Sequence, residues 1–511
     1  MSHEVLVALP AILAGVGALL VLAGRTRVPY PILLVVGGAA LALVPGVPEV
    51  ALEPDLVLVL FLPPLLYAAA FFTSLPELRR TARPIGMLAV GAVGATVLGV
   101  AAAGHWLLGL PWEAAFVLGA VLGPTDPVAA TAIAGRLGAP RRYVSIVEGE
   151  SLVNDATALI AYKVAVAAAV TGAFSLGDAA LDLVVAALGG VAIGAAVGWA
   201  VTEVRRRIDD APTEIAVSFL APYLAYLPAE ALGVSAVLAA VVTGVWLGWR
   251  AREIVAPSTR IQAFATWEVL VFVLNAAIFV LVGLQLPVVA DGVAVGPLLL
   301  DAALVVAVLT AVRFAWVLVT GSGPRGRHEP PRDRRVQVLV AFTGLRGAVS
   351  LAAALAIPAE VPARDELVFL AYAAVFATVV GQGLALPWVI ARLGLRGSDE
   401  ERERVELRAR RDAAQAALDR LEELDGSDWV ADDTLRRMRE LYAFRVRRFD
   451  QRLEGRDDEL ERRSAAYQRL RREVLEAERR AIVRLHDDGG LDDELMRRVE
   501  RDIDLDDARL G

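Results

Sequence analysis

The sequence contains no cysteine, and Lys163 is its only lysine. Disulfide bonds, thiol catalysis and cysteine metal sites are therefore excluded. The four histidines, at positions 3, 105, 328 and 486, are too scattered to predict a metal cluster. No G-x-x-x-x-G-K-[ST] motif occurs and no Ser-His-Asp set stands out, so nothing indicates ATP hydrolysis or another enzyme activity. We expect no cofactor and no nucleic-acid partner.

Apolar residues, by contrast, are abundant. They make up 56% of the 511 residues, and the mean hydropathy is +0.55. This composition predicts an all-α membrane protein that crosses the bilayer many times. We count thirteen candidate spans, centred near residues 14, 38, 63, 96, 122, 158, 190, 220, 240, 275, 307, 346 and 380. The start MSHEVLVALP lacks a basic region, so we interpret it as part of a retained first span and not as a cleaved signal.

The arginines between the predicted spans fall on one side. Alternate connections hold 21 arginines, whereas the opposite connections hold only Arg364. The positive-inside rule then places the N-terminus outside the cell and the C-terminus in the cytoplasm. We therefore expect a multi-pass protein of the cell membrane.

The composition changes near residue 398. Residues 399–511 hold 33 acids and 26 arginines, and their apolar residues recur with helical spacing, as in Leu435, Met438, Leu441 and in Leu460, Tyr467, Leu470, Val474. This pattern predicts a transmembrane domain over residues 1–398 and a cytoplasmic helical domain or coiled coil over residues 399–511. The alternative is a solvated charged extension without a specific partner.

The stretch VEGESLVNDATALIAY, residues 147–162, holds three acids inside a predicted span. At about 100° per residue, Glu148, Ser151 and Asp155 share one helix face, while Glu150 and Asn154 share another. An acid inside the membrane is costly and usually functional. We expect Asp155 to lie deepest. Glu148 is either part of the same site or an interfacial acid near the cytoplasmic end.

Two spans are predicted to be broken. In GPTDPVAA, two prolines three residues apart bracket Thr125 and Asp126, which predicts irregular backbone at membrane depth. In GLRGAVSLA, Arg346 lies between two glycines and needs a buried acidic partner, either Glu150 or Asp126. The broken spans are the fifth and the twelfth, so spans 1–6 and 8–13 are predicted to be inverted repeats, as in transporters whose broken helices form the binding site.

Other polar residues in the spans have simpler interpretations. We expect Lys163 to reach the outer interface or to pair with an acid. Asn275 is predicted to make a hydrogen bond between helices. Arg313 is left open between a structural ion pair and a contact with lipid headgroups.

The side chains around the breaks are rich in oxygen, as hard cations require. Asp155, Ser151, Asn154, Thr125 and freed backbone carbonyls are the candidates. Desolvation favours the neutral form of a buried carboxyl group, so one carboxylate can hold either a proton or a metal cation. Alternating access would then exchange one cation for protons.

At this point the sequence resembles a known family. The segments FLPPLLYAAAF, GPTDPVAA, GESLVNDATAL, NAAIFVLVGLQL and GLRGAVSLA, in this order, are similar to those of sodium/proton exchangers, in particular their bacterial cation:proton antiporter branch. The resemblance covers about residues 5–395. It implies a thirteen-span inverted-repeat fold, usually a homodimer, with separate dimerisation and ion-carrying bundles. Such antiporters transport ions and contribute to pH homeostasis.

The resemblance also implies roles for individual residues. Asp155 would carry the ion and the proton, and an asparagine at position 154 implies electroneutral, one-for-one exchange. Ser151 would be a ligand of Na+, as would Thr125. The family's Thr-Asp at the helix crossing corresponds to Thr125 and Asp126, and its buried Glu–Arg pair corresponds to Glu150 and Arg346.

One position departs from the pattern. Some relatives have a glutamate in the third span that helps to bind the cation, and the corresponding residue here is Ala68. Exchange of Na+, with K+ or Li+ as further substrates, is the first hypothesis, and K+/H+ exchange is the alternative. A cation channel, or a membrane sensor that signals to a partner or ligand of the tail, is a third hypothesis from another class.

Overall fold

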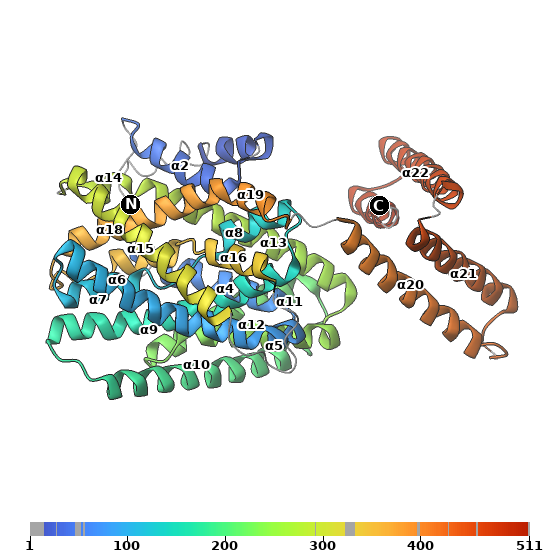
Figure 1. The fold of residues 1–511 in the computed structure, drawn as a ribbon. Helices are drawn as coiled ribbons and strands as arrows, with labels where there is room; N and C mark the ends of the chain where they lie inside the picture. The colour runs from blue at the N-terminus through green and yellow to red at the C-terminus, as the bar shows by residue number, and fades with distance from the viewer. Residues whose placement is uncertain are drawn as a thin grey trace. The chain divides into compact units, whose positions relative to one another are not determined.

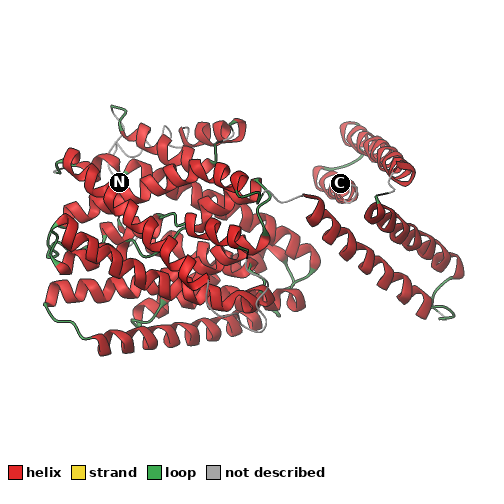
Figure 2. Ribbon diagram, in the orientation of Figure 1, coloured by secondary structure: helices red, strands yellow, loops and turns green. Residues whose placement is uncertain are grey.

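The computed structural model describes residues 15–26, 28–45, 53–54, 57–291, 293–321, 333–395, 399–427, 429–455 and 458–508. All regular structure in these residues is helical (Figure 2). Contacts divide the chain into two units, Met1–Arg396 and Gly397–Gly511. The boundary expected after residue 398 lies two residues from this division.

The helices of the first unit follow the predicted spans (Figure 1). Up to residue 205 they are α2 (Tyr30–Ala42), η1 (Val57–Phe61), α4 (Leu62–Phe72), α5 (Leu75–Gly86), η2 (Met87–Ala92), α6 (Val93–Leu108), α7 (Trp112–Val121), α8 (Pro127–Arg136), α9 (Arg141–Thr171) and α10 (Leu176–Arg205). They continue as α11 (Ala211–Ala231), α12 (Ala236–Ile254), α13 (Pro257–Leu284), α14 (Leu286–Ala290), α15 (Val295–Gly321), α16 (Arg334–Phe342), α17 (Ala348–Leu355), α18 (Arg364–Ala377), η3 (Thr378–Gln382) and α19 (Gly383–Arg392).

Each predicted centre from residue 38 to residue 380 falls in one of these helices or in a break between two half-helices. The centre near residue 14 lies outside the described residues. Within the described residues, six helical stretches are long and apolar enough to cross a membrane, namely 75–108, 141–171, 177–205, 257–290, 295–321 and 364–392. The all-α, multi-pass prediction is confirmed, whereas the number of thirteen spans stays a prediction.

Local sequence explains where several helices end. Gly109 and Gly172 close α6 and α9 in the left-handed conformation, with φ of 72° and 68°, which costs glycine nothing. The segment LPAEALG, residues 227–233, forms the end of α11 and the start of the turn before α12. Gly233, with φ of 71°, turns the chain there, and Ser235 caps α12 by accepting from the Leu238 N–H.

Helices of the first unit pack in two groups. The broken helices α7/α8 and α16/α17 lie with α5, α6, α9, α15, α18 and α19, whereas α2 and α4 pack on α13 and α12. Glycines allow close approach at both of the latter interfaces. A Cβ on Gly283 of α13 would meet the Val35 carbonyl of α2, and a Cβ on Gly248 of α12 would meet the Phe71 carbonyl of α4.

These two interfaces bear on the predicted inverted repeats. If spans 1–6 correspond to spans 8–13, then span 2 corresponds to span 9 and span 3 corresponds to span 10. A contact between spans 2 and 10 in one repeat arrangement therefore corresponds to a contact between spans 9 and 3 in the other. The observed pairs α2 with α13 and α12 with α4 are these two contacts. Helix α10 lies outside both predicted repeats and runs along one edge of the unit (Figure 1). Many of its apolar side chains are exposed.

The second unit consists of two helical hairpins. Helix α20 (Asp399–Glu423) packs on α21 (Asp432–Glu454), and α22 (Asp458–Asp487) packs on α23 (Asp493–Ala508). Leu407, Ala414, Val446 and Phe449 form the core of the first hairpin. In the second, Leu475 and Ile503 are buried, whereas the predicted apolar face of Tyr467, Leu470 and Val474 is partly or largely exposed.

Candidate functional site: a cavity at two crossing broken helices

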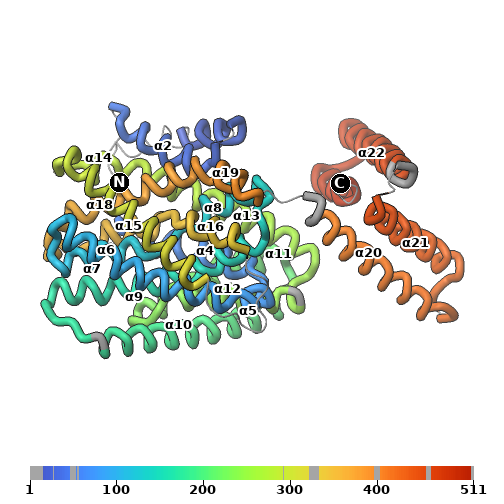
Figure 3. Tube along the Cα trace, in the orientation of Figure 1, coloured from blue at the N-terminus to red at the C-terminus, as the bar shows by residue number. Residues whose placement is uncertain are grey.

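Two irregular segments meet inside the first unit. Residues 122–126 separate α7 from α8, and residues 343–347 separate α16 from α17. Figure 3 labels α7, α8 and α16 on the Cα trace of this unit. The Asp126 N–H donates to the Leu345 carbonyl at 2.8 Å. Gly347 lies so close to the Asp126 carboxylate that a Cβ would collide with it. The predicted breaks are therefore present, and they cross each other.

Charged side chains stabilise the ends of the half-helices, where backbone N–H and carbonyl groups have no partner within the helix. Asp126 is the N-cap of α8 and accepts from the Val128 N–H at 2.8 Å. Arg346 donates its Nε–H to the Leu122 carbonyl at 2.7 Å and another N–H to the Gly344 carbonyl. Those carbonyls lie at the C-terminal ends of α7 and α16. The acid thus meets the positive end of one helix dipole, and the guanidinium meets the negative ends of two others.

The expected ion pair between Glu150 and Arg346 is wrong. Both oxygens of Glu150 accept from Arg313 of α15, at 2.6 and 2.8 Å. The guanidinium of Arg346 is instead held by backbone carbonyls, so it does not need the carboxylate as a hydrogen-bond acceptor. Both the acid and Arg313 are almost fully buried. Sequence analysis identified Arg313 as an intramembrane base but had no means of choosing between the two arginines.

The Glu150 carboxylate also anchors a chain of side-chain hydrogen bonds. The Thr125 hydroxyl donates to Glu150 at 3.1 Å, and the Asn154 amide donates to the Thr125 oxygen at 2.7 Å. Helix α9 is thereby tied to the break between α7 and α8. Asn154 is completely buried and lies next to Asp155 in the chain, so the network also orients the part of α9 that presents Asp155.

A cavity of about 110 Å³ lies beside the crossing. Of the predicted site residues, the structure brings together Asp155, Ser151, Thr125 and Asp126 in its wall, and Glu148 lines it too. Asn154 is directed into the hydrogen-bond network described above. Apolar side chains of η1, α4 and α13 form much of the remaining wall. The volume is enough for several water molecules or a hydrated ion.

The electrostatics of this cavity favour a cation. Asp155 and Asp126 line the same cavity, so two negative charges face one small space when both carboxyl groups are ionised. Among the described residues, no arginine or lysine forms an ion pair with either of them. Asp155 is buried and Asp126 is half-buried, and two such carboxylates without a counter-charge are unfavourable in a medium of low dielectric constant. A bound cation or proton would supply the missing charge.

The expectation for Ala68 needs refinement. Ala68 is buried in an apolar cluster with Tyr67, Val201 and Leu247. The next residue, Ala69, lines the cavity. The third span therefore presents a methyl group to the cavity where an acid would add a carboxylate.

Three further polar residues of the spans have definite surroundings: Asn275, for which a hydrogen bond was predicted, Ser350, which sequence analysis missed, and Lys163, which it left open. Asn275 of α13 lines the cavity, and its side chain makes no hydrogen bond to another described residue, contrary to the expected bond between helices. Ser350 of α17 also lines the cavity. Lys163 pairs with Glu230 of α11 at 2.9 Å, which is one of the two predicted alternatives, and both side chains are largely exposed.

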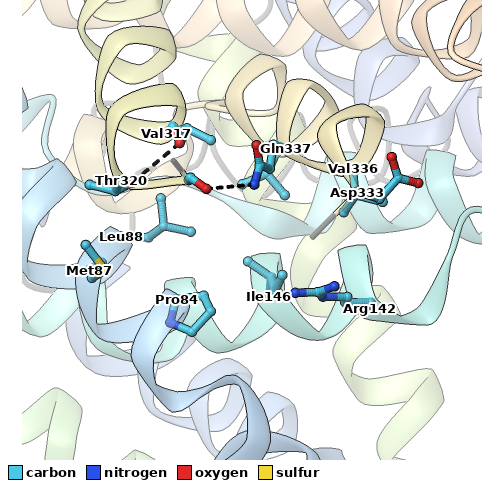
Figure 4. A pocket seen from close by; sticks show the side chains of 12 residues that line it. Pro84, Met87, Leu88, Arg142, Ile146, Val317, Thr320, Asp333, Val336 and Gln337 are labelled. Atoms are coloured by element: carbon cyan, nitrogen blue, oxygen red, sulfur yellow. Dashed lines mark hydrogen bonds between the residues drawn. The ribbon is translucent and has the colours of Figure 1, made fainter. Parts of the chain in front are cut away.

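A second hollow, of about 80 Å³, is distinct from this cavity. Figure 4 shows it between η2, α9, α15 and α16, with Met87, Leu88, Ile146 and Val336 among its mostly apolar walls. Arg142 and other polar groups line it as well. None of the carboxylates at the helix crossing reaches it, so we do not assign it to the candidate site.

A multi-pass membrane unit with crossing broken helices and a carboxylate-lined cavity defines an ion-coupled transporter. Residues 9–392 match the family described as the transmembrane sodium/hydrogen exchanger. An uncharacterised Na(+)/H(+) exchanger of Mycobacterium tuberculosis is 36% identical, over 99% of this chain and 96% of the relative. The chain belongs to the sodium/hydrogen exchanger family.

Other similar proteins agree with this assignment. A sodium, potassium, lithium and rubidium/H(+) antiporter of Bacillus pumilus is 34% identical, over 70% of this chain and 57% of the relative. The solved structure of the sodium proton antiporter MjNhaP1 from Methanocaldococcus jannaschii superposes with a TM-score of 0.61 at 18% identity, covering 78% of this chain and all of that one. The latter likeness concerns the fold alone.

Proposed function

We propose that this protein exchanges monovalent cations, Na+ first, for protons across the cell membrane, with Asp155 as the shared carrier. The observation that supports this proposal is the position of Asp155. It lies in a cavity with Ser151, Thr125 and Asp126, beside two crossing broken helices, with no basic partner among the described residues. Carboxylate and hydroxyl oxygens are suitable ligands for a hard cation.

The exchange follows from competition at one carboxylate. Asp155 binds either Na+ or a proton, so the carrier is neutral in both loaded states and no uncompensated charge has to cross the protein. Ser151 and Thr125 add oxygen ligands for the cation. Asp126 caps α8 and adds a negative field, whereas Asn154 is neutral and engaged with Thr125. One titratable carrier with a neutral neighbour supports electroneutral, one-for-one exchange.

Alternating access requires relative movement of the two helix groups. The cavity has walls from both: α9 and the broken helices on one side, and α4 and α13 on the other. A sliding or tilting of one group against the other would open the cavity to each side in turn. We place the N-terminus outside and residues 399–511 in the cytoplasm, and we propose a homodimer in which the apolar surface of α10 is covered by lipid or by the partner.

Potassium transport by the same site is the second candidate. Ala69 in the α4 wall supplies no carboxylate to the cavity, which weakens discrimination in favour of a small cation. The relative from Bacillus pumilus is named for sodium, potassium, lithium and rubidium. Competition of Na+ against K+ at a fixed pH gradient in proteoliposomes distinguishes the two candidates.

The test of the carrier is the substitution Asp155→Asn. We expect it to abolish cation-driven proton flux in proteoliposomes while the protein remains folded and monodisperse. Glu113→Gln, at the exposed start of α7, is the matched control and should keep wild-type flux. Sodium-driven proton flux through the Asp155→Asn variant would refute the proposal.

Flux measurements with and without a membrane potential test the stoichiometry and distinguish an exchanger from a channel. Flux that does not depend on the potential is expected for one-for-one exchange. A conductance at fixed pH that persists after substitution of Asp155 would instead indicate a channel.

A further inference from the structure

Ser350 is the third residue of α17 and is completely buried. Its hydroxyl has no hydrogen-bond partner among the described residues. Serine and threonine in helices usually donate to a carbonyl one turn earlier, as Thr343 does to Leu339 and Thr378 does to Ala374. The Ser350 hydroxyl makes no such bond, so the backbone of its own helix does not supply the hydrogen-bond partner that this buried group needs.

The place of Ser350 suggests what its partner is. It lines the same cavity as Asp155, Ser151 and Asp126. A buried polar group without a protein partner is normally satisfied by a water molecule or an ion. The cavity, of about 110 Å³, has room for either.

We infer that the Ser350 hydroxyl oxygen is a further ligand of the transported cation. The inference rests on the proposed function, because it assumes that the cation binds beside Asp155. It means that both broken helices contribute oxygens, Thr125 from the first and Ser350 from the second. The oxygen lone pair faces the cation, and the hydroxyl proton is accepted by a carboxylate or water in the cavity. The hydroxyl also supplies an oxygen in a cavity where Ala69 supplies none.

A set of variants tests this role. Ser350→Ala should raise the apparent KM for Na+ roughly tenfold or more, as expected for the loss of one bond to a charged group. Maximal flux and its pH dependence at saturating Na+ should stay close to those of the wild type, since the proton carrier is untouched. Ser350→Thr retains the hydroxyl and should restore the KM. Val349→Ala, which changes the same cavity wall without removing an oxygen, is the matched control.

A binding measurement separates this inference from the proposed function. Stabilisation by added NaCl against thermal unfolding should be absent in Asp155→Asn, weakened in Ser350→Ala and normal in Ser350→Thr. If Asp155→Asn loses stabilisation while Ser350→Ala keeps the wild-type KM and stabilisation, only the role of Ser350 is overturned. If Asp155→Asn keeps flux and stabilisation, the proposed carrier itself is wrong.

A second experiment decides the matter if Ser350→Ala does not fold. The natural sequence has no cysteine, so Ser350→Cys introduces the only thiol. We expect a small cationic methanethiosulfonate to modify that thiol and Na+ to slow the modification, while choline does not. A thiol that is unreactive, or reacts equally fast with and without Na+, would overturn the inference.

Discussion

Separating Glu150 from Arg313 is the most direct test of how the core is held together. Arg313→Met removes two hydrogen bonds, of 2.6 and 2.8 Å, from a carboxylate whose side chain is 2% exposed. Only the Thr125 hydroxyl would remain as a described donor to Glu150. Leaving one buried charge of a pair uncompensated costs about 3–5 kcal/mol. We expect the free energy of unfolding of Arg313→Met to fall by that amount.

The double variant gives the coupling energy. Glu150→Gln with Arg313→Met removes both charges, so its cost should be at least about 2 kcal/mol smaller than the sum of the two single costs. The same cycle with Arg346→Met in place of Arg313→Met should show much weaker coupling, because Arg346 is held by carbonyls. Unfolding in mixed detergent micelles with increasing dodecyl sulfate, followed by tryptophan fluorescence, measures both cycles. Stronger coupling of Glu150 to Arg346 than to Arg313 would refute the assigned pair.

Three further predictions concern the crossing, the pH response and the second unit. Gly347→Ala should destabilise the protein by about 1–3 kcal/mol, because the added Cβ collides with Asp126. Gly381→Ala is the control and should leave the stability unchanged, because its Cβ enters open space. Equal melting temperatures for the two variants would contradict this prediction. If protons and Na+ compete one for one, the acidic limb of the activity–pH profile should move down by about one pH unit for each tenfold rise in Na+, and a fixed profile would argue against a shared carrier. The hydrogen bond to Asp493 raises the pKa of His486, so this link stabilises the α22–α23 hairpin below the ordinary histidine pKa and is lost as pH rises through the raised value. Hydrogen exchange of residues 484–495 in the full chain should therefore speed up with pH beyond its intrinsic increase in the wild type, and less so in Asp493→Asn.

The membrane class and the two broken helices could be predicted because they depend on local sequence. A run of about 20 apolar residues commits a segment to a span whatever its neighbours are. Pro124 and Pro127 interrupt a helix because they lack N–H donors, and this effect needs no tertiary contact. The same is true of the faces of α9: helical geometry alone separates Glu150 and Asn154 from Ser151 and Asp155, and the structure places the two sets in the network and in the cavity wall, respectively.

The choice of partners could not be predicted, because it depends on which faces of distant helices meet. Arg313 and Arg346 both lie in predicted spans, and either could have been the partner of Glu150. Sequence spacing contains no information on the relative rotation of α9, α15 and the segment before α17. Carbonyls freed at the ends of α7 and α16 satisfy Arg346, a solution that appears only once the crossing is built. A missing hydroxyl partner, as at Ser350, is likewise visible only in three dimensions.

By itself, then, the sequence determined that this protein is a multi-pass exchanger with Asp126 at a helix break and with Glu150 and Asp155 inside a span. Hydropathy, proline breaks and helical periodicity act within one or two turns of chain, so they can be recognised without the tertiary structure. Tertiary structure alone decided that Arg313 is the partner of Glu150, that Ala69 and not Ala68 faces the cavity, and that Asn275 and Ser350 line it. These features are set by the rotation and depth of whole helices against one another, and close contacts such as Gly347 on Asp126 define that arrangement.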